Sequence, residues 1–319
     1  LSMLMSIPTI LAAGGLLVGV LGWLAPQVAG GARPELTLVE VLPGLTLAFK
    51  LEPLGLAFAL LSAALWCVTL VYAAGYLRGH GEANQTRFFA FFALAIGATQ
   101  GVALAGNLFT LFVFYELLTV TTYPLVTHHQ TPEARRAGRV YLGVLMGASI
   151  GLLLLAVALT WQTAGTLDFR PGGTLAGRAE GALLGVLLGL YAFGTAKAAL
   201  MPLHRWLPAA MVAPTPVSAL LHAVAVVKAG VFVVLKVVVY VFGLELLGGS
   251  GFEVALAAAA GATIVLASLV ALGQDNLKAR LAYSTVAQLA YIVLGAALAN
   301  ELGLLGGGFH IAAHALGKI

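Results

Sequence analysis

Charged residues are scarce in this chain. Asp, Glu, Lys and Arg make up 9% of its 319 residues, whereas a soluble domain carries about 25%. Hydrophobic residues make up 61%, and the mean hydropathy is +1.02. This composition excludes an ordinary soluble domain and predicts an all-α membrane protein, a polytopic helical bundle. The net charge is +4 and the arginines lie in short loops, so we expect them to set membrane topology and not to bind nucleic acid.

Cysteine is nearly absent, and its scarcity excludes two kinds of site. The single residue, Cys67, cannot form an internal disulfide and cannot supply the thiolates that hold an iron–sulfur cluster. No glycine-rich pattern of the dinucleotide-binding kind is followed by a strand and an acid, so we expect no flavin and no other cofactor. Because Cys67 lies in an apolar run, we expect it to pack as a small buried side chain.

Long apolar runs dominate the chain instead. A transmembrane helix needs about 20 residues, because a hydrocarbon core of about 30 Å is crossed at about 1.5 Å per residue. Ten candidate spans are predicted, at 3–25, 53–77, 87–106, 107–128, 138–161, 183–207, 213–241, 252–273, 277–300 and 302–319. Pro202 interrupts the sixth span, which predicts a broken helix there. The Gly- and Pro-rich segments 26–52 and 162–182 are expected to be loops, since no strand-like alternation stands out.

The chain begins at Leu1 without a methionine and ends at Ile319 inside an apolar segment. No signal peptide is visible. We therefore expect residues 1–319 to be a single transmembrane domain truncated at both ends.

Positive charge is distributed unequally between alternate loops. One set of loops holds eight basic residues: Arg78, Arg87, Arg135, Arg136, Arg139, Arg205, Lys278 and Arg280. The other set holds four: Arg33, Lys50, Arg170 and Arg178. The positive-inside rule places the first set in the cytoplasm, so we expect a multi-pass protein of the cell inner (plasma) membrane in that orientation.

Five charged residues lie inside the predicted spans and are the most informative feature of the sequence. They are Glu116, Lys197, Lys228, Lys236 and Lys318. An ionisable group at the bilayer centre costs about 2.5–3.5 kcal/mol on insertion scales, and such groups usually mark ion or proton pathways. One acid and four lysines on separate helices suggest a proton relay.

Glu116 and Lys197 are predicted to form an ion pair between adjacent helices. Both lie near mid-membrane, and Lys197 precedes the helix-breaking Pro202 by five residues. Carbonyls freed by the proline, together with water, can solvate an ammonium at this depth. A nearby acid favours the charged lysine and burial opposes it, so a moving acid would switch Lys197 between holding and releasing a proton. The alternatives are a purely structural ion pair and a lysine that snorkels to the interface.

Further titratable residues extend the predicted relay. His222 and Lys228 share a span, and histidine titrates near neutrality, although a lone histidine is often only a hydrogen-bonded core residue. Lys236 lies nearer the end of that span, where snorkelling and function are equally plausible. His310, His314 and Lys318 are spaced four residues apart and so form a stripe on one helix face. Zinc binding by the two histidines is the rival interpretation, but no Cys or carboxylate lies nearby in sequence.

Other polar residues have simpler interpretations. His128 and His129, with the arginines at 135, 136 and 139, are most simply a solvated loop. Lys278 and Arg280 are most simply anchors that orient a helix, and His204 is expected at the edge of the cavity beside Pro202.

Several motifs resemble those of one family of membrane proteins. The run 197–232, KAALMPLHRWLPAAMVAPTPVSALLHAVAVVKAGVF, resembles the signature that is shared by the proton-conducting subunits of Mrp-type cation/proton antiporters and the antiporter-like subunits of respiratory complex I. Further similar runs are RFFAFFALAIG (87–97), NLFTLFVFYELLT (107–119), DNLKARLAYSTVAQLAYI (275–292) and HIAAHALGK (310–318). Lys228 in VVKAG, with PLHRWLP, favours the D-type member of the Mrp antiporters.

This resemblance implies a fold and a set of roles. The family fold has two inverted repeats of five helices, each with a broken helix, which implies a first repeat over 87–241 and the start of a second, incomplete one over 252–319. The relay then consists of Glu116, Lys197, His222, Lys228, Lys236, His310, His314 and Lys318. The second broken helix lies beyond the chain, and Gly317 stands where a bulky aromatic is common.

Three functions compete at this point. The leading one is a proton-translocating subunit of a multisubunit Na⁺/H⁺ antiporter, with other membrane subunits as partners. The second is a proton-pumping membrane subunit of an NADH-quinone oxidoreductase or a related membrane hydrogenase. The third, a carrier of an organic solute, is weaker because the polar groups in the spans are titratable and not a mixed, substrate-shaped set.

Overall fold

The computed structural model describes residues 2–220 and 224–319. The elements are α1 (Ser2–Ala29), β1 (Glu35–Leu42), β2 (Leu45–Lys50), α2 (Pro53–Gly79), α3 (Gln85–Ala103), α4 (Leu108–Val126), α5 (Pro132–Ala148), η1 (Ser149–Leu153), α6 (Leu154–Ala164) and α7 (Gly181–Gly194). They continue with η2 (Ala196–Ala198), α8 (Trp206–Ala209), η3 (Ala210–Val212), α9 (Thr215–Leu220), α10 (Val226–Val237), η5 (Val238–Phe242), α11 (Leu244–Gly248), α12 (Phe252–Leu272), α13 (Leu277–Ala297) and α14 (Glu301–Lys318).

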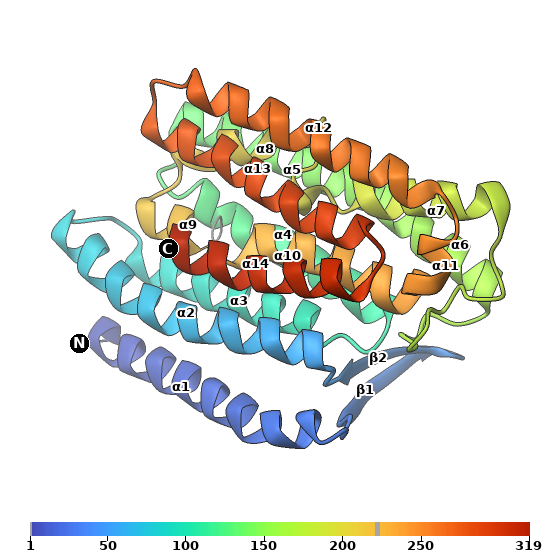
Figure 1. Ribbon diagram of the computed structural model, residues 1–319. Coiled ribbons are helices and arrows are strands. Elements are labelled where there is room, and N and C mark those ends of the chain that lie inside the picture. The colour runs from blue at the N-terminus through green and yellow to red at the C-terminus, as the bar shows by residue number, and fades with distance from the viewer. Residues whose placement is uncertain (1, 221–223) are drawn as a thin grey trace.

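Long apolar helices form the body of the molecule, which confirms the predicted helical membrane fold. Six of them, within the described residues, have the length and composition to cross a membrane: Ile10–Ala29, Pro53–Gly79, Gln85–Ala103, Leu108–Val126, Pro132–Ala164 and Phe252–Leu272. The fifth is continuous through a π-helical turn, η1. These helices lie side by side in one bundle (Figure 1).

Helix α10 lies at the centre of the bundle. Every residue from Val226 to Val237 is buried, because α3, α4, α7, α13, α14 and the turn η2 all pack against it. Helix α1 lies at the edge, along α2, and α12 lies on the opposite outer side (Figure 1). Cys67 is half-buried, where α2 faces Gly14 of α1.

A β-hairpin replaces part of the loop expected over 26–52. Strands β1 and β2 pair antiparallel, with Glu35 opposite Lys50 and Leu42 opposite Leu45. The prediction missed it because ELTLVEVL mixes β-branched and other apolar residues without clean alternation. Gly44 has a φ of +78° in the connecting turn, a conformation that glycine adopts without strain.

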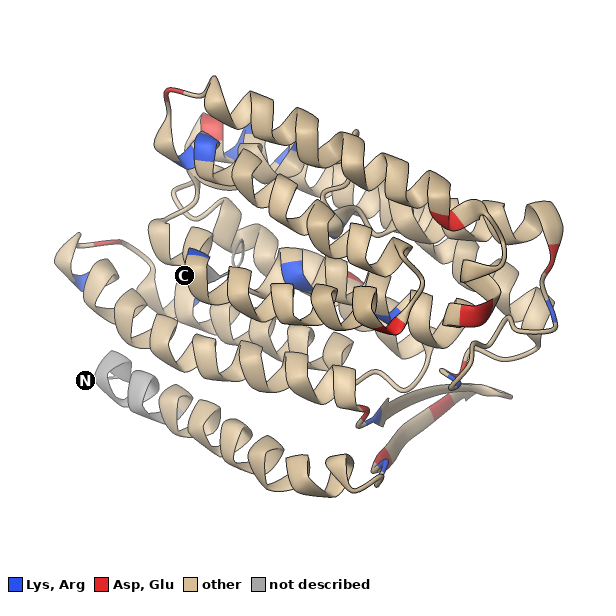
Figure 2. Ribbon diagram, in the orientation of Figure 1, with Lys and Arg blue, Asp and Glu red and all other residues tan. Residues whose placement is uncertain are grey.

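Charged residues gather at the two ends of the bundle, and the middle is almost uncharged (Figure 2). One end, here called the hairpin end, carries β1, β2 and the 165–180 segment (Figure 1). The opposite end, called the basic end, carries the turns after α2, α4 and α12. Contacts join these turns: Arg87 donates to the His128 carbonyl at 3.0 Å, and the Lys278 ammonium donates to the carbonyl of Ala213 at 3.2 Å. Arg87 and Lys278, two of the basic residues predicted to share one side, therefore lie at the same end of the bundle.

Candidate functional site

Lys197 lies in a break between helices and not within one. Helix α7 ends at Gly194, Lys197 occupies the short turn η2, and regular helix resumes only at Trp206. The predicted interruption at Pro202 is confirmed, because Pro202 lies within this break, which begins earlier in the chain, at Thr195. Ala199 takes a φ of +55°, and the Trp206 ring nitrogen donates to the Ala196 carbonyl at 2.9 Å. The chain at Lys197 is thus held by contacts across the break.

Residues of helix α4 contact the Lys197 side chain, which is 0% exposed. The Lys197 Nζ donates to the Tyr115 carbonyl oxygen at 2.8 Å and to Thr119 Oγ1 at 2.6 Å. It lies 3.2 Å from the centroid of the Tyr115 ring, and the Lys197 backbone N–H donates to the Tyr115 hydroxyl at 3.1 Å. Carbonyl, hydroxyl and aromatic face replace water around an ammonium without fixing its charge.

Glu116 follows Tyr115 on α4, and its carboxylate has no direct partner. Both oxygens are buried without a hydrogen bond to any described residue. Glu116 and Lys197 interact electrostatically, but none of the ion pairs within 4.0 Å in the described part of the chain joins them. A buried polar atom without a partner is costly unless water or a rearrangement supplies one. The predicted pair therefore stays a prediction.

A second group of relay candidates connects α10 to α14. Lys228 is 0% exposed and His314 is 7% exposed, and the Lys228 Nζ is hydrogen-bonded to His314 Nδ1. An ammonium can only donate, so Nδ1 accepts when the lysine is charged. The opposite imidazole nitrogen, Nε2, is buried without a partner among the described residues. One proton can accordingly sit on either member of this pair.

The stripe His310, His314 and Lys318 lies against α13 and α10. The rings of His310 and His314 stack with centroids 6.2 Å apart, and His310 Nε2 lies 2.7 Å from the Gln288 side-chain oxygen. The Lys318 Nζ donates to Ser284 Oγ at 2.6 Å. Within this stripe, His314 thus also contacts the buried Lys228 of α10 through its Nδ1. From His314, which contacts the buried Lys228, the stripe continues to Lys318 beside the first part of α13, towards the basic end.

Lys236 forms a third group, which includes an acid that the sequence analysis missed. Lys236 is 0% exposed, so the snorkelling interpretation is wrong. Its Nζ lies 3.4 Å from Glu52 Oε2. Glu52 was assigned to a loop, but it is the residue that precedes the first turn of α2. Its position just before an apolar span and a proline was the available signal.

His222 lies outside the described residues. The remaining predicted residues thus fall into three groups, around Lys197, Lys228 and Lys236. The first two groups come together through the backbone at Gly230, where an added Cβ would lie 2.3 Å from the Lys197 carbonyl carbon.

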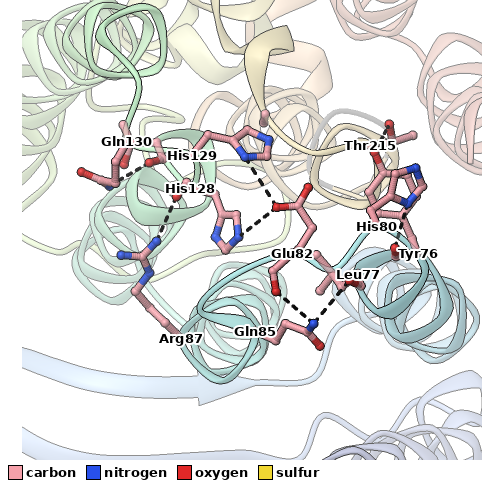
Figure 3. A network of polar contacts seen from close by, with 12 residues as sticks. Tyr76, Leu77, His80, Glu82, Gln85, Arg87, His128, His129, Gln130 and Thr215 are labelled. Atoms are coloured by element: carbon pink, nitrogen blue, oxygen red, sulfur yellow. Dashed lines mark hydrogen bonds and ion pairs between the residues drawn. The ribbon is translucent and has the colours of Figure 1, made fainter.

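A separate polar cluster lies at the basic end (Figure 3). Glu82, after α2, lies 4.0 Å from His128 Nε2 and 3.6 Å from His129 Nδ1. The interpretation as a solvated loop is wrong for His128, which is 5% exposed and packs edge-on against Phe88 with ring centroids 5.4 Å apart. Its pKa lies below the ordinary histidine value, because burial disfavours the charged ring and the Arg87 guanidinium repels it.

Acidification is expected to weaken this cluster. Because the folded-state pKa of His128 lies below the unfolded value of about 6.5, the unfolded chain binds more protons as the pH falls through that value, and stability drops. His128→Phe should flatten the fall in thermal stability between about pH 7.5 and 5.5. The exposed His80, which stacks on Tyr76, provides the control: His80→Phe should keep the wild-type pH dependence. If thermal stability falls with pH as steeply in His128→Phe as in the wild type, groups other than His128 cause the pH dependence.

Comparison with known proteins identifies one family. The family described as NADH:quinone oxidoreductase/Mrp antiporter, TM, matches residues 105–319. The chain is 32% identical over 308 residues to NAD(P)H-quinone oxidoreductase subunit 5, organellar chromatophore 1, of Paulinella chromatophora, covering 92% of this chain and 44% of that protein. It is also 32% identical over 308 residues to a probable K(+)/H(+) antiporter subunit, of the A/B type, from Rhizobium meliloti (strain 1021), covering 92% of this chain and 29% of that protein.

Two solved structures are similar over almost the whole chain. The Mrp complex from Dietzia sp. DQ12-45-1b aligns with a TM-score of 0.81 at 30% identity, covering 99% of this chain and 34% of that chain. The membrane-bound sulfane sulfur reductase, an archaeal respiratory membrane complex, aligns with a TM-score of 0.83 at 28% identity, covering 98% and 63%. The chain spans less than half the length of the two curated relatives described above. With its helical fold, its helix break at Lys197 and the family match over two thirds of its length, the chain belongs to the NADH:quinone oxidoreductase/Mrp antiporter transmembrane family.

Proposed function

We propose that this chain is a proton-translocating part of one subunit in a multisubunit monovalent cation/proton antiporter, with Na⁺ as the cation. The observation that carries the proposal is Lys197, a fully buried ammonium in a helix break, beside a buried acid that has no hydrogen-bond partner among the described residues. Intramembrane ionisable groups of this kind usually mark proton pathways. A relative named as a probable K(+)/H(+) antiporter subunit and the family description, which names the Mrp antiporter, support the antiporter class.

Proton transfer would begin between Glu116 and Lys197. With the carboxylate close, Lys197 keeps its proton, since opposite charge favours the ammonium. When the carboxylate turns away, desolvation favours the neutral amine and the proton leaves. The neutral acceptors Tyr115 and Thr119 hold the side chain in either state. No large backbone movement is needed for this switch.

The released proton would next reach Lys228 and His314. Their hydrogen bond lets one proton move from the ammonium to the imidazole. His310 and Lys318 continue on the same face of α14. We also propose, from the family resemblance, that residues 87–241 form the first inverted repeat, that 252–319 begin the second, and that His222 belongs to the path.

The second candidate is a proton-pumping membrane subunit of an NADH-quinone oxidoreductase. The similarity to subunit 5 of the Paulinella enzyme favours it, and the same residues would move protons in either complex. Inverted membrane vesicles that hold the complete parent complex distinguish the two. Proton movement driven by a Na⁺ gradient is expected from an antiporter, with K⁺ as the comparison. Proton movement that requires NADH and quinone would instead assign the chain to the oxidoreductase.

We propose that the basic end faces the cytoplasm of a cell whose inner (plasma) membrane holds the complex. Its excess of Arg and Lys supports this orientation. A membrane-impermeant maleimide should label Arg135→Cys in inverted vesicles and not in right-side-out ones, in a Cys67→Ser background. Arg170→Cys, at the hairpin end, should show the reverse pattern. Labelling of position 135 from the outer side alone would overturn the orientation.

A further inference from the structure

Lys236 occupies a closed site near the hairpin end. Its Nζ lies 3.4 Å from Glu52 Oε2 and donates to the Ala105 carbonyl oxygen at 2.6 Å. The ring of Phe169 lies over it, with its centroid 4.6 Å from Nζ. In the described part of the chain, Lys236 is the one fully buried lysine with a carboxylate within 4.0 Å. Its environment therefore differs from that of Lys197, whose ammonium donates its hydrogen bonds to neutral acceptors.

Glu52, the acid that pairs with Lys236, lies near a second ion pair that is more exposed to solvent. Glu52 has extended backbone angles, so it and Lys50, two residues earlier at the end of β2, point to the same side. Lys50 in turn lies 3.9 Å from Glu35 Oε2 on β1. The exposed fractions of the four side chains rise in order, 0% and 5% for Lys236 and Glu52, and 28% and 54% for Lys50 and Glu35. We call these four residues the charge ladder.

A role in stability alone explains the buried Lys236–Glu52 ion pair poorly. A buried ion pair can often be replaced by apolar residues of similar volume without loss of stability, because burial of both charges is costly. The surroundings of Lys236, with Phe169 and Phe232 near its ammonium, would accept such a residue. The π-helical turn η5 begins at Val238, two residues after Lys236, and π turns inside helices are frequent at functional sites.

We infer that the charge ladder is a proton route between the buried Lys236 and water at the hairpin end, with Glu52 and Lys236 as relay residues. This inference rests on the proposed function. The Lys236 N–H bond breaks as the Glu52 O–H bond forms, which leaves a neutral amine and a neutral carboxyl group. The carboxyl group then gives its proton to water beside the half-buried Lys50, and the amine takes a new proton from the interior. Lys228 lies eight residues earlier on α10, about 12 Å along the helix axis.

The test uses the complete parent complex in inverted vesicles, with proton movement followed by a pH-sensitive dye. The double variant Glu52→Gln/Lys236→Met removes both charges and keeps the volumes, so an ion pair with a role in stability alone would tolerate it. We expect normal assembly and at least about a hundredfold slower proton movement, the size typical of a lost proton-transfer group. Glu253→Gln, which changes an acid at the same end outside the ladder, should keep the wild-type rate. A wild-type rate in the assembled double variant would overturn the inference.

Two further single variants test the inference if the double variant does not assemble. Lys236→Arg keeps a cation beside Glu52 but hardly releases its proton, so transport should be lost with assembly retained. Glu52→Asp keeps a titratable group and should restore part of the rate with a displaced pH profile, which a structural role would not produce. Normal transport by Lys236→Arg would contradict the route. If the wild-type complex moves no protons, the proposed function itself fails. If the wild-type complex moves protons and the variants of Glu52 and Lys236 move them equally fast, only the inferred route through the charge ladder is refuted.

Discussion

Lys197→Ala is expected to abolish proton translocation by the complete parent complex while assembly is retained. The ammonium is the cation held in the α7–α8 break by Tyr115 and Thr119, and alanine leaves no group there that can carry a proton. Loss of a positioned proton-transfer group slows a reaction by about 10²–10⁴-fold. Dye-monitored proton movement in inverted vesicles, at matched amounts of assembled complex, measures the effect.

Lys197→Arg separates charge from proton release. Arginine keeps the positive charge but hardly gives up its proton, so this variant should also fail. Arg136→Ala, which removes an exposed cation at the basic end, serves as the control and should transport normally. Near-normal transport by either Lys197 variant would refute the role assigned to this residue.

Gly230→Ala is expected to have the largest structural effect, because it separates α10 from the helix break. A Cβ at Gly230 would lie 2.3 Å from both the Lys197 carbonyl carbon and the Ala198 nitrogen. Both are backbone atoms, so no side chain can rotate away. Inserting a methyl group into a packed core typically costs about 1–3 kcal/mol, and here it also displaces Lys197. We expect a lower thermal unfolding temperature together with lost proton translocation.

Gly261→Ala provides the matched control. Gly261 lies inside α12, and nothing occupies the space within 4 Å of its missing Cβ. Alanine favours helix over glycine by about 1 kcal/mol, so this variant should be as stable as wild type or more so. Equal stability of the Gly230 and Gly261 variants would show that α10 and the break do not pack as described.

The membrane fold could be predicted from the sequence because the scarcity of charge is a property of the whole chain and does not depend on where individual helices begin and end. The same scarcity singled out Lys197, Lys228 and Lys236, which are the three lysines with 0% exposure. The stripe on α14 was predictable because helical periodicity alone places His310 and His314 on one face. Their roles in proton transfer remain predictions that the variants above test.

The features that sequence analysis missed depend on tertiary contacts. Pro202 indicated a broken helix, but the break begins at Thr195, where the chain bonds to α4 and packs on Gly230. Glu52 is recognised as a candidate relay residue only through its ion pair with Lys236, which lies far away in the sequence and close in the fold. His128 is buried because the turn after α4 packs against α3, which its polar neighbours in the sequence concealed.

We propose that Glu116, Lys197, Lys228 and His314 share one hydrated path through the bundle. A structure of the complete parent complex at a resolution that shows ordered water tests it most directly. We expect water molecules that bridge the Glu116 carboxylate to the Lys197 ammonium, and a further chain of waters from Lys197 to the Lys228–His314 pair. A dry interior, with apolar side chains packed between these groups and no water at the Glu116 oxygens, would contradict it.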